Sequence, residues 1–209
     1  EENASFSFMA IGDVPYHLPE DFERFDRMIA QINKDKPAFT LHVGDIKSGH
    51  IPCSDEYYEK IKEYFDSFDE AWQKSDVTFG TLHVIGSNNN FDSGKGALND
   101  EFYERELANN FWLISLFEAA KKNNSNGLVL VLHAGLNYNN KDENNGHASF
   151  VTLLRQQVQD YDKPVLLLYG DHHRFMVNQP MRDNNGKTLT NFTAVQVFGD
   201  NDIHAVKIN

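Results

Sequence analysis

The chain has 209 residues, 40% of them hydrophobic, which is enough for one domain with a sizeable core. Its formal net charge is −12 and no basic stripe offsets it, which argues against wrapping nucleic acid or binding an anionic membrane. No apolar run approaches the roughly eighteen residues of a membrane span. Cys53 is the only cysteine, which excludes an intramolecular disulfide and a Cys-based zinc cage. We predict a single domain over residues 1–209.

Five apolar runs, each followed by a polar turn, predict buried strands. The runs cover residues 6–11, 38–43, 77–85, 128–132 and 165–169. The turns read Gly12-Asp13-Val14-Pro15-Tyr16, Gly44-Asp45-Ile46-Lys47-Ser48-Gly49, Gly86-Ser87-Asn88-Asn89-Asn90, His133-Ala134-Gly135 and Gly170-Asp171-His172-His173. Ligands bind at the carboxyl ends of strands in open layered sheets. We therefore expect these side chains to converge on one oxygen- and nitrogen-rich site.

Helical patterns alternate with these strands. Amphipathic spacing predicts helices over residues 19–33, 54–73, 98–122 and 148–161, the third of them burying Phe102, Leu107, Phe111 and Phe117. After Asp171 the pattern changes to short strands near residues 174–178, 194–198 and 204–208, with a hairpin signal at Asn185-Gly186. An α/β layered sandwich is the fold that this order favours.

The strand-end residues are of the types that hard divalent cations bind. One Gly-Asp after a strand is ordinary turn chemistry, but three together with His133 favour a metal site. Asp45, expected on a central strand, is the better candidate for bridging two ions. Asp171 and His173 should lie on one side of an extended segment, which turns His172 elsewhere, towards substrate.

Other histidines have weaker assignments. His17, His50 and His147 lie in loops where they could protonate a leaving group, whereas His42 and His83 lie inside strands and are expected to be packed or hydrogen-bonded. The chain has no Gly-x-Ser-x-Gly elbow, no phosphate-binding Gly-x-x-x-x-Gly-Lys-Ser/Thr loop and no Gly-x-Gly-x-x-Gly after its first strand.

The sequence resembles the calcineurin-like metallophosphoesterases in the order and type of four elements: Asp13, Asp45, His133 and the Asp171-His172-His173 turn. The likeness is stronger to a bacterial, often exported branch, whose motifs match residues 12–16, 44–49 with 52–55, 83–89 and 170–173. The resemblance implies a four-layer α-β-β-α sandwich with mixed sheets and two metals at the sheets' carboxyl edge. It also implies phosphoester hydrolysis by a metal-bound hydroxide.

The chain departs from the family at three places. Pro15 stands where the family often has a metal-binding His, which leaves Tyr16 or His17 as substitutes, and Asp171 replaces the first His of the last turn. The Gly-Asp-Asn-Glu segment of the branch, which does the work of the family's Gly-Asn-His turn, is missing between the second and third blocks. Asn88 is a geometric substitute, and the missing segment predicts reduced activity.

These observations lead to one hypothesis with one alternative. We expect Asp45 to bridge two divalent ions (Mn, Fe, Zn, Mg or Ca), with Asp13 and His173 on one and His133, Asp171 and Asn88 on the other. The partner would be a phosphorylated small molecule or polymer. The alternative is a catalytically silent metallophosphoesterase-like binding module. Because the chain begins without Met and resembles an exported branch, we expect it to be exported to the periplasm or the extracellular space.

Overall fold

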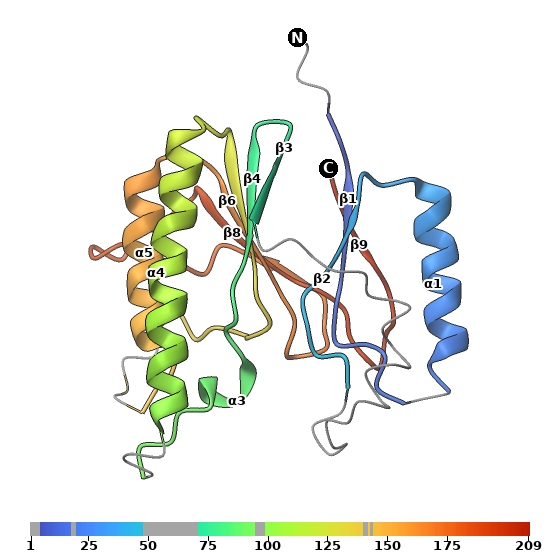
Figure 1. The fold of residues 1–209 in the computed structure, drawn as a ribbon, viewed down its shortest axis with the longest axis horizontal. Helices are drawn as coiled ribbons and strands as arrows, with labels where there is room; N and C mark the ends of the chain where they lie inside the picture. The colour runs from blue at the N-terminus through green and yellow to red at the C-terminus, as the bar shows by residue number, and fades with distance from the viewer. Residues whose placement is uncertain (1–4, 18–19, 48–70, 95–98, 140–141, 143) are drawn as a thin grey trace.

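The computed structural model describes residues 5–17, 20–47, 71–94, 99–139, 142 and 144–209, which form two mixed β-sheets with helices on their outer faces (Figure 1). The smaller sheet has the strand order β2-β1-β9. Its central strand, β1 (Phe8–Ile11), is parallel to β2 (Thr40–His42) and antiparallel to β9 (Val206–Ile208). Asp13 and Asp45 therefore follow neighbouring strands that run in the same direction.

The larger sheet has the order β3-β4-β5-β6-β8-β7. Its four inner strands are mutually parallel and include the ones that precede the third, fourth and fifth polar turns. Antiparallel strands close both edges. The strands are β3 (Ala71–Lys74), β4 (Val77–Thr81), β5 (Gly127–Val131), β6 (Val165–Tyr169), β7 (Met176–Asn178) and β8 (Phe192–Gln196).

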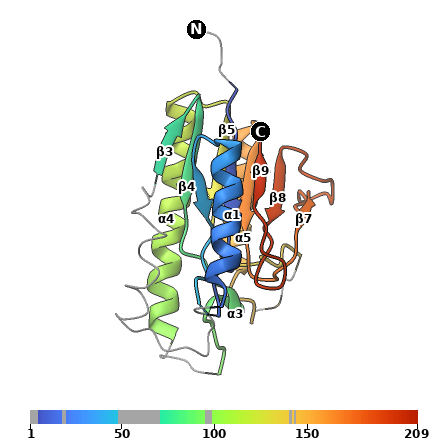
Figure 2. The ribbon, with the colours of Figure 1, turned by 90° about the vertical axis from the view of Figure 1, so that its right-hand side faces the viewer.

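Helices cover the two outer faces. α1 (Phe22–Asp35) lies on the smaller sheet, whereas α4 (Asp100–Lys122) and α5 (Ala148–Tyr161) lie side by side on the larger one, as Figures 1 and 2 show from two directions. The short α3 (Gly86–Asn89) follows β4. Within the described residues, none of the helices combines the length and the apolar composition that crossing a bilayer requires.

Among the described residues, three apolar clusters lie between the layers, because successive residues of a strand point to opposite faces of its sheet. In β1, Phe8 and Ala10 join the cluster between the two sheets, and Met9 and Ile11 join the cluster under α1. In β5, Val129 and Val131 face the space between the sheets, whereas Leu128 and Leu130 face α4 and α5. Burial on both faces explains why these strands read as continuous apolar runs.

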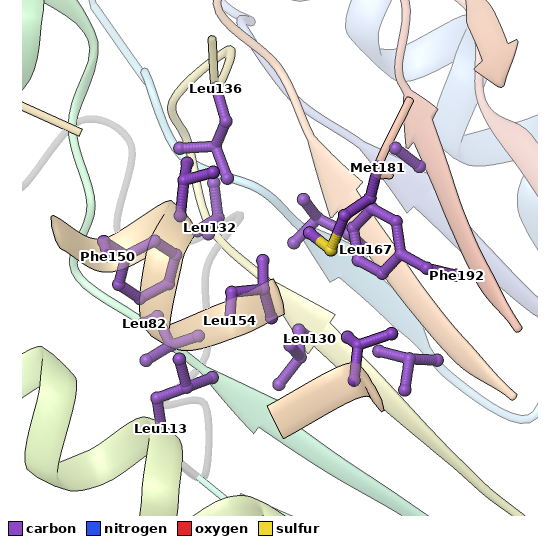
Figure 3. Close-up of a cluster of buried hydrophobic side chains, with 14 of the residues drawn as sticks. Leu82, Leu113, Leu130, Leu132, Leu136, Phe150, Leu154, Leu167, Met181 and Phe192 are labelled. Atoms are coloured by element: carbon purple, nitrogen blue, oxygen red, sulfur yellow. The ribbon is translucent and has the colours of Figure 1, made fainter. Parts of the chain in front are cut away.

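The largest cluster lies between the six-stranded sheet and its two helices. Figure 3 shows part of it, where Leu113 from α4 and Phe150 and Leu154 from α5 pack towards Leu130 and Leu167 of the sheet. All five side chains are at most 1% exposed. This rigid layer fixes the positions of the strand ends that carry His133 and Asp171.

The predicted elements are confirmed for most of the described residues, and α5 and β6 have the predicted bounds. The predicted helix 54–73 is wrong at its end, because Ala71–Lys74 is strand β3, which turns back through Ser75 and Asp76 into β4. The rest of that helix lies outside the described residues. Leu107 and Phe111, expected to be buried, are 73% and 71% exposed. Among the described strands, β2 lies at the edge of its sheet rather than at the centre.

Candidate metal centre

Asp13 follows β1 and is completely buried, with 0% of its surface exposed. Its backbone has a positive φ of 54° and its amide donates to the Gly44 carbonyl oxygen over 3.1 Å, which locks the first turn onto the second. Gly170 packs directly against its carboxylate. A Cβ at position 170 would lie 2.4 Å from Asp13 Oδ1, so only glycine leaves room for this side chain.

Asp45 follows β2 and also has a positive φ, of 59°. The Tyr16 hydroxyl donates a hydrogen bond to Asp45 Oδ2, and the same hydroxyl lies 3.2 Å from Nε2 of His173. Tyr16 is one of the two predicted substitutes for the metal-binding His of the family that the sequence resembles, and the structure places its hydroxyl between Asp45 and His173.

His133 follows β5 and lies between the two acids. Its Nδ1 is 3.4 Å from Asp13 Oδ1 and its Nε2 is 3.8 Å from Asp45 Oδ2. One ligand atom from each of the three residues lies within 4.8 Å of the others, a spacing that a single ion can span. We call Asp13, Asp45 and His133 the metal centre. The predicted convergence of strand ends from both sheets is confirmed for these three residues.

The hydrogen bonding of these residues fits a bound cation. Within the described part of the chain, both carboxylate oxygens of Asp13 and Nδ1 of His133 are buried without a hydrogen bond of normal geometry. Buried polar atoms are nearly always paired, because an unpaired one costs free energy. A cation bound between these residues would give such buried atoms the partner that they lack.

The electrostatics of the metal centre point the same way. Burial raises the pKa of Asp13 from 3.8 to about 7; the backbone amide of Asp171 opposes this rise, and the negative charges of Asp45 and Asp171 add to it. Burial also raises the pKa of Asp45 and lowers that of His133. Without a cation the site thus favours uncharged side chains. A divalent ion would reverse this preference, and its binding should strengthen as pH rises.

The last turn, after β6, supplies neighbours to the metal centre. Asp171 Oδ1 lies 4.0 Å from His133 Nε2, and its Oδ2 accepts a hydrogen bond from the Gly135 amide at 2.8 Å. Asp171 and His173 both have positive φ angles, so the expected extended segment is wrong. The bend still brings both side chains near the centre. His172 is exposed, with Nδ1 3.4 Å from Oε1 of the buried Gln196.

The remaining predicted residues lie elsewhere. His17 is exposed and its Nε2 is 3.7 Å from Asp200 Oδ2, while His50 lies outside the described residues. The Asn88 side chain bonds to backbone of a neighbouring loop: Oδ1 accepts from the Gly146 amide at 2.9 Å, and Nδ2 donates to the carbonyl oxygens of Phe91 and Asn144.

Two of the weaker histidine assignments can also be placed. His42 is hydrogen-bonded, as expected, to the Val14 carbonyl and the Gly44 amide. His147 is buried, and its Nε2 lies 3.0 Å from the Ile85 carbonyl oxygen. It therefore holds the turn after β4 in place rather than lining the metal centre.

Sequence reasoning missed Arg105 and Gln196. Arg105 is 9% exposed and holds Asn89 through both the side-chain and the backbone oxygen of that residue. A signal was present, because Arg105 and Asn109 share the buried face of α4 with Phe102 and Leu113. Polar residues on an apolar helix face indicate buried hydrogen-bond partners. Gln196 ends β8 and offers no such local signal.

Gly170→Ala tests whether the buried position of Asp13 matters for metal binding. The added methyl group would displace the Asp13 carboxylate, so we expect metal affinity to fall by about 10- to 100-fold, the usual cost of disturbing the surroundings of metal ligands. Calorimetric titration with Mn²⁺ measures this, with the fold checked by circular dichroism. Gly94→Ala is the control, because Gly94 is exposed and a Cβ added there would come no closer than 3.3 Å to its nearest neighbour, Asp92 Oδ1. Equal affinity in the two variants would contradict the assignment.

Comparison with models of known protein families gave no match, and comparison with curated proteins gave none either.

Proposed function

We propose that the chain is a metal-dependent phosphoester hydrolase with the calcineurin-like metallophosphoesterase architecture, a four-layer α-β-β-α sandwich. The observation that carries the proposal is the group of unpaired buried atoms on Asp13 and His133, next to Asp45. These residues stand in the family's order along the chain and follow parallel strands of two packed sheets. A purely structural network would give those atoms hydrogen bonds of normal geometry, and within the described residues they have none.

Each residue has a role in this proposal. Asp13, Asp45 and His133 would hold a divalent ion, with Asp171 and His173 beside it and Tyr16 fixing the Asp45 carboxylate. When bound, the ion would supply positive charge and Lewis acidity at the phosphoryl group of a substrate. The positive charge of the ion matters because the protein's net charge of −12 would otherwise repel a phosphate group. In this proposal the exposed His172, in the same turn as Asp171, would donate a proton to the leaving oxygen.

We expect this activity to be weak. A second ion would need further ligands, and among the described His, Cys, Asp and Glu residues only Asp13, Asp45 and His133 form a group tight enough for metal. Asn88, the predicted extra ligand, uses its side chain to hold loop backbone. Losing one charge-stabilising group typically slows catalysis by about 100- to 1,000-fold. One well-occupied ion with a weak or vacant neighbour is the expected state.

Steady-state assays with an aryl phosphomonoester and an aryl phosphodiester, over several divalent metals, test the proposed function. We expect metal-dependent turnover below the ordinary enzymatic range of about 1 to 1,000 per second. Turnover within that range would show that another residue replaces the missing segment. Metal binding without any turnover would favour the alternative, a catalytically silent binding module. The Asn88 side chain also favours that alternative, because it accepts a hydrogen bond from the Gly146 amide instead of facing the metal centre.

A further inference from the structure

The outer face of α4 exposes a row of large apolar side chains. Tyr103, Leu107 and Phe111 are 54%, 73% and 71% exposed, and they follow one another at intervals of four residues. Residues four apart lie on the same face of a helix, one turn above the other. We call these three residues the outer stripe. Among the described residues, the other exposed large apolar side chains are Phe175 and Val177, far along the chain.

The opposite face of α4 is already packed. Leu113, Leu116 and Phe117 are at most 1% exposed and belong to the cluster between the helices and the six-stranded sheet. A helix that is apolar on all sides is normally buried on all sides. Figure 2 shows α4 along one side of the molecule. The helix therefore has the composition of one that packs on two sides, and the sheet with α5 accounts for one of them.

The other two long helices lack such a row. Exposed positions on α5 include Gln156 and Asp160, and exposed positions on α1 include Glu23 and Arg27. Within the described residues, neither helix exposes a large apolar side chain. The outer stripe is thus a local feature of α4, and a contiguous apolar surface of this kind marks an interaction site.

The two ends of α4 carry opposite charges. Its first turn contains Asp100 and Glu101, and its last turn contains Lys121 and Lys122. Two such helices that pack antiparallel place the acidic end of each beside the basic end of the other. Antiparallel packing also brings the positive end of each helix dipole to the negative end of its partner.

A twofold axis near Phe111 gives this arrangement, because residue 111 lies midway between residues 100 and 122 of α4. The Phe111 rings of the two copies would then meet at the axis, with Tyr103 and Leu107 on either side. Glu104 and Glu118 are exposed beside the outer stripe, in the rim of such an interface, where charged groups remain in contact with water.

The charge pattern favours a second copy over a membrane. Helices that lie on membranes carry Lys and Arg beside their apolar face, whereas acids lie beside most of the outer stripe and the chain has a net charge of −12. The order acid, apolar, base along α4 is self-complementary under a twofold rotation. A symmetric interface between two identical surfaces requires that property.

We propose that the outer stripe is the interface of a homodimer in which α4 of one copy packs antiparallel against α4 of the other. The proposal concerns assembly and does not depend on the proposed function. Because one helix from each copy supplies the contact, the interface is small, and the dimer should dissociate in the micromolar range, at the weak end for specific complexes.

Sedimentation equilibrium over a series of protein concentrations tests the proposal. We expect the wild type to show a monomer–dimer equilibrium, and Leu107→Glu and Phe111→Glu each to weaken the dimer by at least about 100-fold, because each copy would bring an unpaired charge into an apolar contact. Both side chains are exposed in the single chain, so the fold should survive, as circular dichroism would check.

Val177→Glu is the matched control, since it makes the same kind of change at another exposed apolar residue, 56% exposed on β7. It should dimerise like the wild type. A wild type that is monomeric at every concentration, or a dimer that Val177→Glu disrupts and Phe111→Glu does not, would overturn the proposal. Binding of monomeric wild type to phosphatidylcholine–phosphatidylglycerol vesicles would also overturn it and would identify a membrane-binding surface.

Charge reversal tests the antiparallel direction. We expect Asp100→Lys alone, and Lys121→Asp together with Lys122→Asp, to weaken the dimer by about three- to tenfold, because each places like charges at both ends of the interface. All three substitutions in one chain should recover most of the lost affinity. A combined variant that dimerises no better than the separate ones would show that the acidic and basic ends do not meet.

Discussion

Asp45→Asn should lower divalent-metal affinity by at least about 100-fold and phosphoester turnover by about 100- to 1,000-fold, the largest effect on function that we expect. Asparagine keeps the shape of the side chain but removes the negative charge that faces His133 at 3.8 Å. Calorimetric titration with Mn²⁺ and steady-state assays with an aryl phosphate measure the two effects. The loss of affinity should exceed that in Asp13→Asn if Asp45 bridges two ions.

The control for this variant is Asp160→Asn, which makes the same chemical change on the exposed surface of α5. It should leave both affinity and turnover unchanged. Metal affinity in Asp45→Asn equal to that of the control would show that Asp45 is not a ligand.

Asp13→Asn should stabilise the metal-free protein at pH 8, although it weakens metal binding. Burial raises the pKa of Asp13 to about 7 in the folded protein, against 3.8 ordinarily. A raised acid contributes stability that is fully present below pH 3.8 and is lost as pH rises through about 7. The wild type should therefore lose about 2–3 kcal/mol relative to Asp13→Asn between pH 5 and pH 8.

Denaturant unfolding at both pH values, with chelator and then with saturating Mn²⁺, measures this effect. With chelator at pH 8 the variant should be the more stable protein, and with Mn²⁺ the order should reverse, because only the wild type gains the full free energy of metal binding. A variant that is less stable than the wild type under every condition would contradict the account, since it would make Asp13 a purely structural residue.

The part of the site that sequence predicts is the part governed by strand direction. Asp13, Asp45 and His133 each follow an apolar run, and parallel strands bring their carboxyl ends to one edge, so their convergence follows from pattern alone. The sequence pattern does not predict which of the side chains at that edge lie close enough together to share an ion. His133 rather than His173 completes the metal centre, because the last turn bends through positive φ angles instead of continuing extended.

Local sequence patterns also give wrong predictions at one turn and on one helix face. The helical spacing of residues 54–73 continues through Trp72, but Ser75 and Asp76 adopt positive φ angles and close a hairpin with β4. In α4, Leu107 and Phe111 read as core residues, yet the helix packs through the face that includes Phe102, Leu113 and Phe117. Composition did not distinguish these two faces, since both contain large apolar residues.

The most direct test of the metal centre is elemental analysis of protein purified without chelator, followed by thermal unfolding with and without chelator. We predict about one divalent ion per chain and a melting temperature that falls by about 5–10 °C on chelation, as expected for a ligand present at about 100 times its Kd. Protein that contains no divalent metal, and whose melting temperature does not change with chelator or added metal, would contradict the assignment of Asp13, Asp45 and His133 as ligands.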